Sequence, residues 1–151
     1  MTVRYFEDFA VGQKYLGLGG CAIDAAGIKA FAAAYDPEPF HLDEATAERN
    51  PALRGLTASG WHTASITMRL LVDSELRPAG GILGLGVDEI RWLRPVRPGD
   101  VLRIETEILE LRPSESRPGQ GIIKVRTTTF NQAKEPVQIV ISNLLAERRA
   151  A

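Results

Sequence analysis

The chain has 151 residues, with 18 Lys and Arg against 19 Asp and Glu, and a formal net charge of −1. This length favours one domain, residues 1–151, that is large enough to bury a core. The balanced charge excludes the basic surface that nucleic-acid and membrane-surface binding requires. Cys21 is the one cysteine, so no internal disulfide forms, and with two histidines the chain has too few ligands for a dedicated zinc site.

No apolar run approaches the roughly 18 residues that a membrane helix needs. The first nine residues carry charges where a signal peptide has an apolar stretch. We therefore expect a cytoplasmic protein, and we expect neither a metal nor a cofactor.

The first half of the chain predicts helices after a loop and a short strand within the first twenty residues. Asp24 is a candidate N-cap, and apolar residues at helical spacing follow it as far as Pro37. Pro37 and Pro39 disfavour the helical region for the residues before them, so we expect residues 36–40 to be extended and stiff. Asp43 is expected to cap another short helix.

Residues 60–72 predict a central helix that is apolar nearly all round and therefore mostly buried, with Arg69 its one charged residue. The second half predicts strands. Apolar and charged residues alternate over 102–108, and the slip at 109–111 indicates a bulge. Further strands are expected over residues 83–94, 123–126 and 137–141. The sequence thus predicts an α+β fold, with an antiparallel sheet curled around a buried helix.

Asp36 and His41 form the first candidate site, five residues apart on the proline-containing segment. A carboxylate and an imidazole together can orient a water molecule and move its proton, because the free pKa of histidine is about 6.5. The prolines would hold the pair still. The alternative is structural: Asp36 ends a helix, and His41 hydrogen-bonds backbone in a loop.

The second candidate is the small-residue segment 55–61. Backbone N–H groups at the start of the helix that follows are unpaired and lie at the positive end of its dipole. Aimed at a carbonyl oxygen, such a group at Gly60 would stabilise an oxyanion. The alternative is a tight turn that only begins a buried helix.

Three arginines, at positions 91, 94 and 97, lie beside two prolines. They could bind phosphates, or form a solvated rim with Asp88 or Asp100 as partners. His62 is interpreted as packed and hydrogen-bonded rather than catalytic. The glycine pattern of residues 17–22 fits a dinucleotide fingerprint, but the strand and βαβ unit that this motif needs are missing.

Taken in order, these segments resemble the MaoC-like dehydratases of the (R)-specific enoyl-CoA hydratase type. The resemblance rests on Asp-x-x-Pro-x-His-x-Asp over residues 36–43, Ala-Ser-Gly over 58–60, and Arg-Pro-Val-Arg-Pro-Gly-Asp over 94–100. It implies a hotdog fold, an antiparallel sheet wrapped around one long helix. It also implies a homodimer or a trimer of dimers whose sheets pair edge to edge.

The resemblance further implies reversible syn addition of water to a trans-2-enoyl-CoA. Asp36 and His41 would activate the water, and the Gly60 N–H would hold the thioester oxygen. The expected substrate-binding residues are Ser59, Trp61, Arg94 and Arg97. The expected partner is an acyl-CoA or another acyl-thioester substrate.

Two residues depart from the family pattern and leave the acyl group open. Glu38 replaces the usual Asn, and Ser59 stands where a His often precedes the glycine. Two alternative functions also stay open because a fold does not fix a function. They are a hotdog acyl-CoA thioesterase and a non-catalytic acyl-thioester binding protein.

Overall fold

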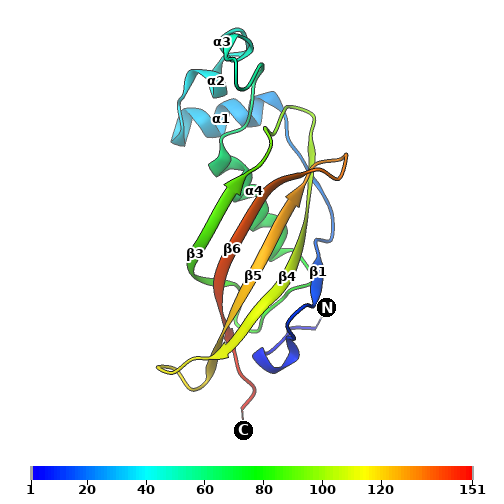
Figure 1. The fold of residues 1–151 in the computed structure, drawn as a ribbon, viewed down its shortest axis with the longest axis vertical. Helices are drawn as coiled ribbons and strands as arrows, with labels where there is room; N and C mark the ends of the chain where they lie inside the picture. Colours follow the sequence, from blue (N-terminus) through cyan, green and yellow to red (C-terminus); the bar gives the residue numbers. More distant parts are fainter. Residues whose placement is uncertain (1, 151) are drawn as a thin grey trace.

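The computed structural model describes residues 2–150, and one curled antiparallel sheet packs against the helix α4 (Figure 1). Within these residues no helix is long and apolar enough to cross a membrane. The helices are η1 (Phe6–Asp8), α1 (Ala25–Tyr35), α2 (Pro39–Leu42), α3 (Glu44–Arg49) and α4 (Gly60–Val72). The strands are β1 (Lys14–Leu16), β2 (Cys21–Ala22), β3 (Leu83–Trp92), β4 (Val101–Pro113), β5 (Gln120–Phe130) and β6 (Pro136–Glu147).

The sheet has the strand order β1-β4-β5-β6-β3, and β2 also pairs with β4. Every one of these pairings is antiparallel. Inward side chains alternate along β4, where Leu102, Ile104 and Ile108 are buried, and along β5, where Ile123 and Val125 are buried. The core therefore lies between the concave face of the sheet and α4, and the predicted α+β hotdog fold is confirmed.

Several local predictions hold because the chemistry that sets them is local. The Asp24 carboxylate accepts a hydrogen bond from the Gly27 N–H at 2.7 Å and begins α1, and the Asp43 carboxylate likewise begins α3. The register of β4 shifts between Ile108 and Glu110, where the phase slip predicted a bulge.

The prediction that residues 36–40 are all extended is wrong at its end. Asp36 is non-helical, but Pro39 begins the short helix α2, which contains His41. Proline is well tolerated at the first position of a helix because its missing N–H would have no partner there. Pro39 therefore starts a helix instead of preventing one.

The helix α4 is also less buried in a single chain than its composition predicts. One face is buried against the sheet through Thr63, Thr67, Leu70 and Leu71. The opposite face exposes large apolar side chains, namely Trp61, Met68 and Val72, with Trp61 57% exposed. An all-round apolar helix indicates two packing partners, and one chain supplies only one of them.

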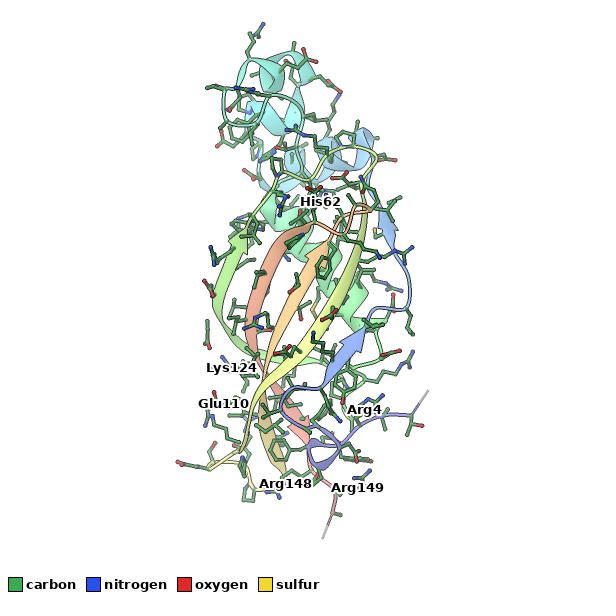
Figure 2. The ribbon with its side chains drawn as sticks, turned by 45° about the vertical axis from the view of Figure 1, so that its right-hand side comes forward. Arg4, His62, Glu110, Lys124, Arg148 and Arg149 are labelled. Carbon is green, nitrogen blue, oxygen red and sulfur yellow. The ribbon has the colours of Figure 1, made fainter. Side chains whose placement is uncertain are left out.

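The two ends of the chain meet at the far end of the sheet from α1. Arg148 and Arg149 lie beside the N-terminal segment (Figure 2), where they pair with Glu7 and Asp8. The ring of Phe6 packs directly over Gly121 in β5, so closely that a Cβ atom on Gly121 would overlap the ring. Gly121 is therefore the position that lets the N-terminal segment close on the sheet.

We predict that Gly121→Ala lowers stability by about 1–3 kcal/mol, because the added methyl group displaces the Phe6 ring. At this chain length each kcal/mol corresponds to roughly 2–4 °C in Tm, which thermal unfolding measures. Gly119→Ala is the matched control, since a Cβ there meets nothing within 4 Å. Equal Tm values for the two variants would contradict this account of the Phe6 contact.

Candidate active site

Asp36 and His41 come together because one helix ends and another begins between them. Asp36 is the C-cap of α1, and its N–H donates to the Ala32 carbonyl at 2.9 Å. One turn later the His41 N–H donates to the Glu38 carbonyl, also at 2.9 Å. Their side chains then face each other, with Asp36 Oδ2 3.4 Å from His41 Nε2. The structure thus brings together the predicted acid–base pair.

The orientation of the His41 ring is set from its other side. Nδ1 lies 2.6 Å from the backbone oxygen of Thr57, and the side chain is only 8% exposed. A carbonyl oxygen can only accept, so Nδ1 carries a proton and donates it. Nε2, which faces Asp36, therefore holds the lone pair of the neutral ring or the second proton of the imidazolium. A group in that position can take a proton from water and return it.

A cavity of about 280 Å³ opens beside His41. It lies between α2, the start of α4, and the segment that links β3 to β4. Its lining includes Phe40, His41, Thr57, Gly60, Thr63, Trp92 and residues 93–96. Most of this surface is apolar, and His41 and the backbone at Gly60 supply polar groups to it. Such a cavity suits a mostly apolar ligand with one polar reacting centre.

Gly60 is the first residue of α4, as the sequence predicted. The N–H groups of a first helical turn have no acceptor within the helix and lie at the positive end of its dipole. The hydroxyl of Ser59 accepts from the Trp61 N–H at 3.2 Å, so this N-cap leaves the neighbouring Gly60 N–H without its help. The position can therefore donate to a carbonyl oxygen in the cavity.

Trp92 is a site residue that sequence reasoning missed. Its indole lies on Gly60 so closely that a Cβ there would be only 2.6 Å from the ring carbon Cδ2. Glycine is thus required at position 60 by its neighbour, and not by a left-handed backbone. The one signal in the sequence was an aromatic residue at the end of a strand that leads to Arg94.

The four predicted substrate-binding residues have different surroundings. Arg94 lines the cavity, pairs with Glu135 at 3.4 Å and donates to the carbonyl oxygen of Pro136, the first residue of β6. The guanidinium of Arg97 donates to the Leu53 carbonyl, behind the cavity. Ser59 is fully buried as the N-cap of α4. Trp61 lies on the far side of Trp92, with the two rings perpendicular and their centroids 5.2 Å apart.

His62 is packed, as predicted, but not hydrogen-bonded through its buried nitrogen. Its ring stacks on Phe31 of α1, with the planes 5° apart and the centroids separated by 4.7 Å. Figure 2 places it at the end of the molecule that carries α1. Nδ1 is buried and has no hydrogen-bond partner among the described residues. Burial lowers the pKa of His62 below its usual 6.5, because desolvation penalises the imidazolium.

Metal ligands do not gather at this site or elsewhere in residues 2–150. No group of three or more His, Cys, Asp or Glu side chains is placed to hold an ion in that part of the chain. The arrangement that is present is a carboxylate–imidazole pair beside the start of α4. Such a pair can carry out acid–base chemistry.

Comparison with known proteins gives the family. The chain belongs to the family described as MaoC-like domain, which it matches over residues 8–131. A solved MaoC-like dehydratase from Rhodospirillum rubrum is 47% identical, with a TM-score of 0.92 over 98% of this chain and 99% of that one. The unliganded R-hydratase PhaJ1 of Pseudomonas aeruginosa is 27% identical, with a TM-score of 0.75 over 96% of this chain and 86% of that one.

A mesaconyl-CoA hydratase of Cereibacter sphaeroides is 37% identical over 68 residues, which are 45% of this chain and 20% of that protein. Family members are thus named as hydratases and dehydratases, and the predicted family is confirmed.

The lowered pKa of His62 predicts a loss of stability in mild acid. The unfolded chain takes up a proton near pH 6.5, whereas the folded protein does so only at lower pH, so stability falls as pH decreases from 6.5 towards the folded pKa. His62→Gln removes this contribution. We therefore expect the Tm of the variant to fall less than that of the wild type between pH 7.5 and 5.5.

Carboxylates also lose stabilising interactions in acid, since the pKa values of Glu7, Asp8 and Asp88 are lowered in the folded chain. Their contribution to the fall in Tm is the same in wild type and variant, so it cancels when the two falls are compared. Equal falls in Tm for wild type and variant would show that His62 titrates alike in the folded and unfolded chains.

Proposed function

We propose that residues 1–151 act as one MaoC-like domain with acyl-thioester hydratase/dehydratase activity. The reaction is the reversible syn addition of water to a trans-2-enoyl-CoA, which gives a 3-hydroxyacyl-CoA. The observation that carries this proposal is the Asp36–His41 pair, 3.4 Å apart, beside a cavity lined by Gly60. The relatives named as an R-hydratase and a mesaconyl-CoA hydratase support the same type of reaction.

The water molecule would bridge Asp36 Oδ2 and His41 Nε2, hydrogen-bonded to both and offset from the line that joins them. With Nδ1 committed to the Thr57 carbonyl, Nε2 of the neutral ring accepts a proton from the water. The water oxygen bonds to C3 of the enoyl group, and the π electrons of the double bond move towards the thioester carbonyl. The proton then passes to C2 from the same side of the molecule, so the addition is syn.

The negative charge that develops on the thioester oxygen needs a donor that is already in place. The Gly60 N–H, at the positive end of α4, supplies that donor. Asp36 meanwhile stabilises the imidazolium that forms when His41 holds the proton. Each group thus acts on charge that appears in the transition state, which is the condition for accelerating the reaction.

The remaining proposed contacts lie at the edges of the cavity. The exposed guanidinium of Arg94 would meet the phosphates of CoA by bidentate hydrogen bonds. Trp61, which packs against Trp92 outside the cavity, would contact the part of the substrate that extends out of it. Ser59 and Arg97 would act from behind, the first by capping α4 and the second by holding the loop at Leu53.

A second copy of this chain is the partner that the exposed apolar surface fits best. A groove of about 400 Å³ runs between α4 and β3 and is lined by side chains that include Trp61, Met68 and Val87. β3 is the last strand of the sheet, so its outer edge offers unpaired backbone groups. We propose a homodimer in which β3 pairs with its copy and the two α4 helices cover each other. Dimers could assemble further into a trimer of dimers.

The first test is an assay with trans-2-enoyl-CoA esters of short to medium chain length. We expect ultraviolet absorbance of the conjugated enoyl group to fall without release of thiol. Asp36→Asn should lower kcat/KM roughly 100- to 10,000-fold, because it removes a member of the acid–base pair. The matched control is Asp43→Asn in the same motif, which keeps its activity; its Tm also changes little, because asparagine caps a helix about as well as aspartate.

Other outcomes of this assay decide between the classes of protein. Thiol release that depends on Asp36 would show that the activity is that of a thioesterase and not of a hydratase. Binding of acyl-CoA esters without turnover, unaffected by Asp36→Asn, would show that the chain is a non-catalytic acyl-thioester binding protein.

The second test is the mass of the protein in solution by sedimentation equilibrium. We expect a dimer, and we expect Val87→Asp to shift it towards monomer, because the substitution places charge in the apolar groove. Val11→Asp is the control, since Val11 is 65% exposed and lies just before β1, away from the β3 edge. A monomeric wild type, or a Val87→Asp variant as dimeric as the control, would contradict the proposed interface.

A further inference from the structure

A row of polar side chains crosses the concave face of the sheet beneath the cavity. Thr129 of β5 and Trp92 of β3 lie directly opposite Gln138 of β6, on its two sides. Gln138 is fully buried, with an exposed fraction of 0%. Its amide reaches two elements at once: it joins Trp92 in the sheet to Thr67 in α4.

The indole fixes the direction of both hydrogen bonds that the Gln138 amide makes. Its Nε1–H can only donate, so the atom of Gln138 that faces it at 2.9 Å is the acceptor Oε1. The amide nitrogen therefore donates to Thr67 Oγ1, at 2.9 Å. The Thr67 hydroxyl in turn lies 2.6 Å from that of Thr129. Gln138 is thus held in one orientation, and it holds the indole in one orientation.

Stability alone does not account for a buried amide at this position. A hydrogen-bonded pair in the core contributes little net free energy, whereas an unpaired buried group is costly. A leucine at position 138 would bury a side chain of comparable size without polar atoms. What the polar pair adds is direction, because it sets the rotation of the indole ring about its bond to the Cβ atom.

The orientation of this ring matters because of what lies on it. The indole covers Gly60, where a Cβ atom would lie 2.6 Å and 2.7 Å from the ring carbons Cδ2 and Cζ2. The same ring lines the cavity that contains His41. A rotated ring would either enter the cavity or leave the Gly60 backbone unsupported.

We propose that Gln138 is a positioning residue that acts through Trp92. It holds the indole flat against Gly60, and so fixes both the N–H that receives the thioester oxygen and the wall beside the reacting carbons. This inference rests on the proposed hydratase function, because it assigns a role in that reaction. Gln138 itself is shielded from the substrate by the indole.

The kinetic test is a double-mutant cycle with Gln138→Leu, Trp92→Phe and the combined variant. We expect Gln138→Leu to lower kcat/KM roughly 10- to 100-fold, mainly through kcat, as a small misplacement of reacting groups does. In the Trp92→Phe background the same substitution should have almost no further effect, because the N–H that it serves is gone. Gln138→Met, of similar length, replaces Gln138→Leu if that variant does not fold.

A spectroscopic test measures the environment and mobility of the Trp92 indole independently of activity. In a Trp61→Phe background Trp92 is the one remaining tryptophan, since the chain has two. We expect Gln138→Leu to shift its fluorescence emission to shorter wavelength and to lower its anisotropy, because the ring loses its acceptor and its fixed orientation. Unchanged emission and anisotropy would overturn the proposal.

The structural control is Thr106→Val. It removes a buried hydrogen bond between two hydroxyls, 3.1 Å from Thr106 to Thr127, elsewhere in the same sheet. It should lower Tm about as much as Gln138→Leu does and leave kcat/KM unchanged. Two outcomes would overturn this inference alone, provided that the wild type is active. Either Gln138→Leu leaves kcat/KM unchanged, or it lowers kcat/KM equally in the wild-type and Trp92→Phe backgrounds. A wild type that hydrates no enoyl thioester would overturn the proposed function as well.

Discussion

The site depends on one packing constraint, the burial of one face of α4 in the curl of the sheet. Thr67 and Leu70 face the strands, and this fixes where the helix begins. The Ala58 N–H donates to the Val96 carbonyl at 2.9 Å, which ties the segment that leads into α4 to the β3–β4 connection that lines the cavity. The position of the Gly60 N–H is therefore a consequence of the core, and a dipole held by a rigid core needs no reorganisation during a reaction.

The same constraint extends to the acid–base pair through the backbone. Thr57 lies on the segment that leads into α4, and its carbonyl oxygen holds His41 Nδ1. Two segments that are sixteen residues apart are thus joined at the imidazole. Whatever fixes α4 in the sheet also fixes the ring, and Asp36 meets that ring from the end of α1. The geometry of the candidate pair therefore depends on the packing of the core.

The sequence was sufficient where short-range chemistry decides the structure. The caps at Asp24 and Asp43, the bounds of the helix at 60–72 and the bulge near residue 109 all follow from neighbours in the chain. It was insufficient where distant residues decide. The pairing of Trp92 with Gln138 spans 46 positions and depends on strand register. The exposed face of α4 likewise depends on how many packing partners one chain can offer.

Backbone groups set much of the geometry of the site, and this bears on the two departures from the family pattern. The side chain of Glu38 is exposed, whereas its carbonyl oxygen receives the His41 N–H. Ser59 is buried and caps α4 with its hydroxyl, which a serine does well. Neither departure removes a group on which the Asp36–His41 geometry depends. The shape of the cavity is set by the side chains that line it, and the largest of these is the indole of Trp92, whose orientation is set from inside the core.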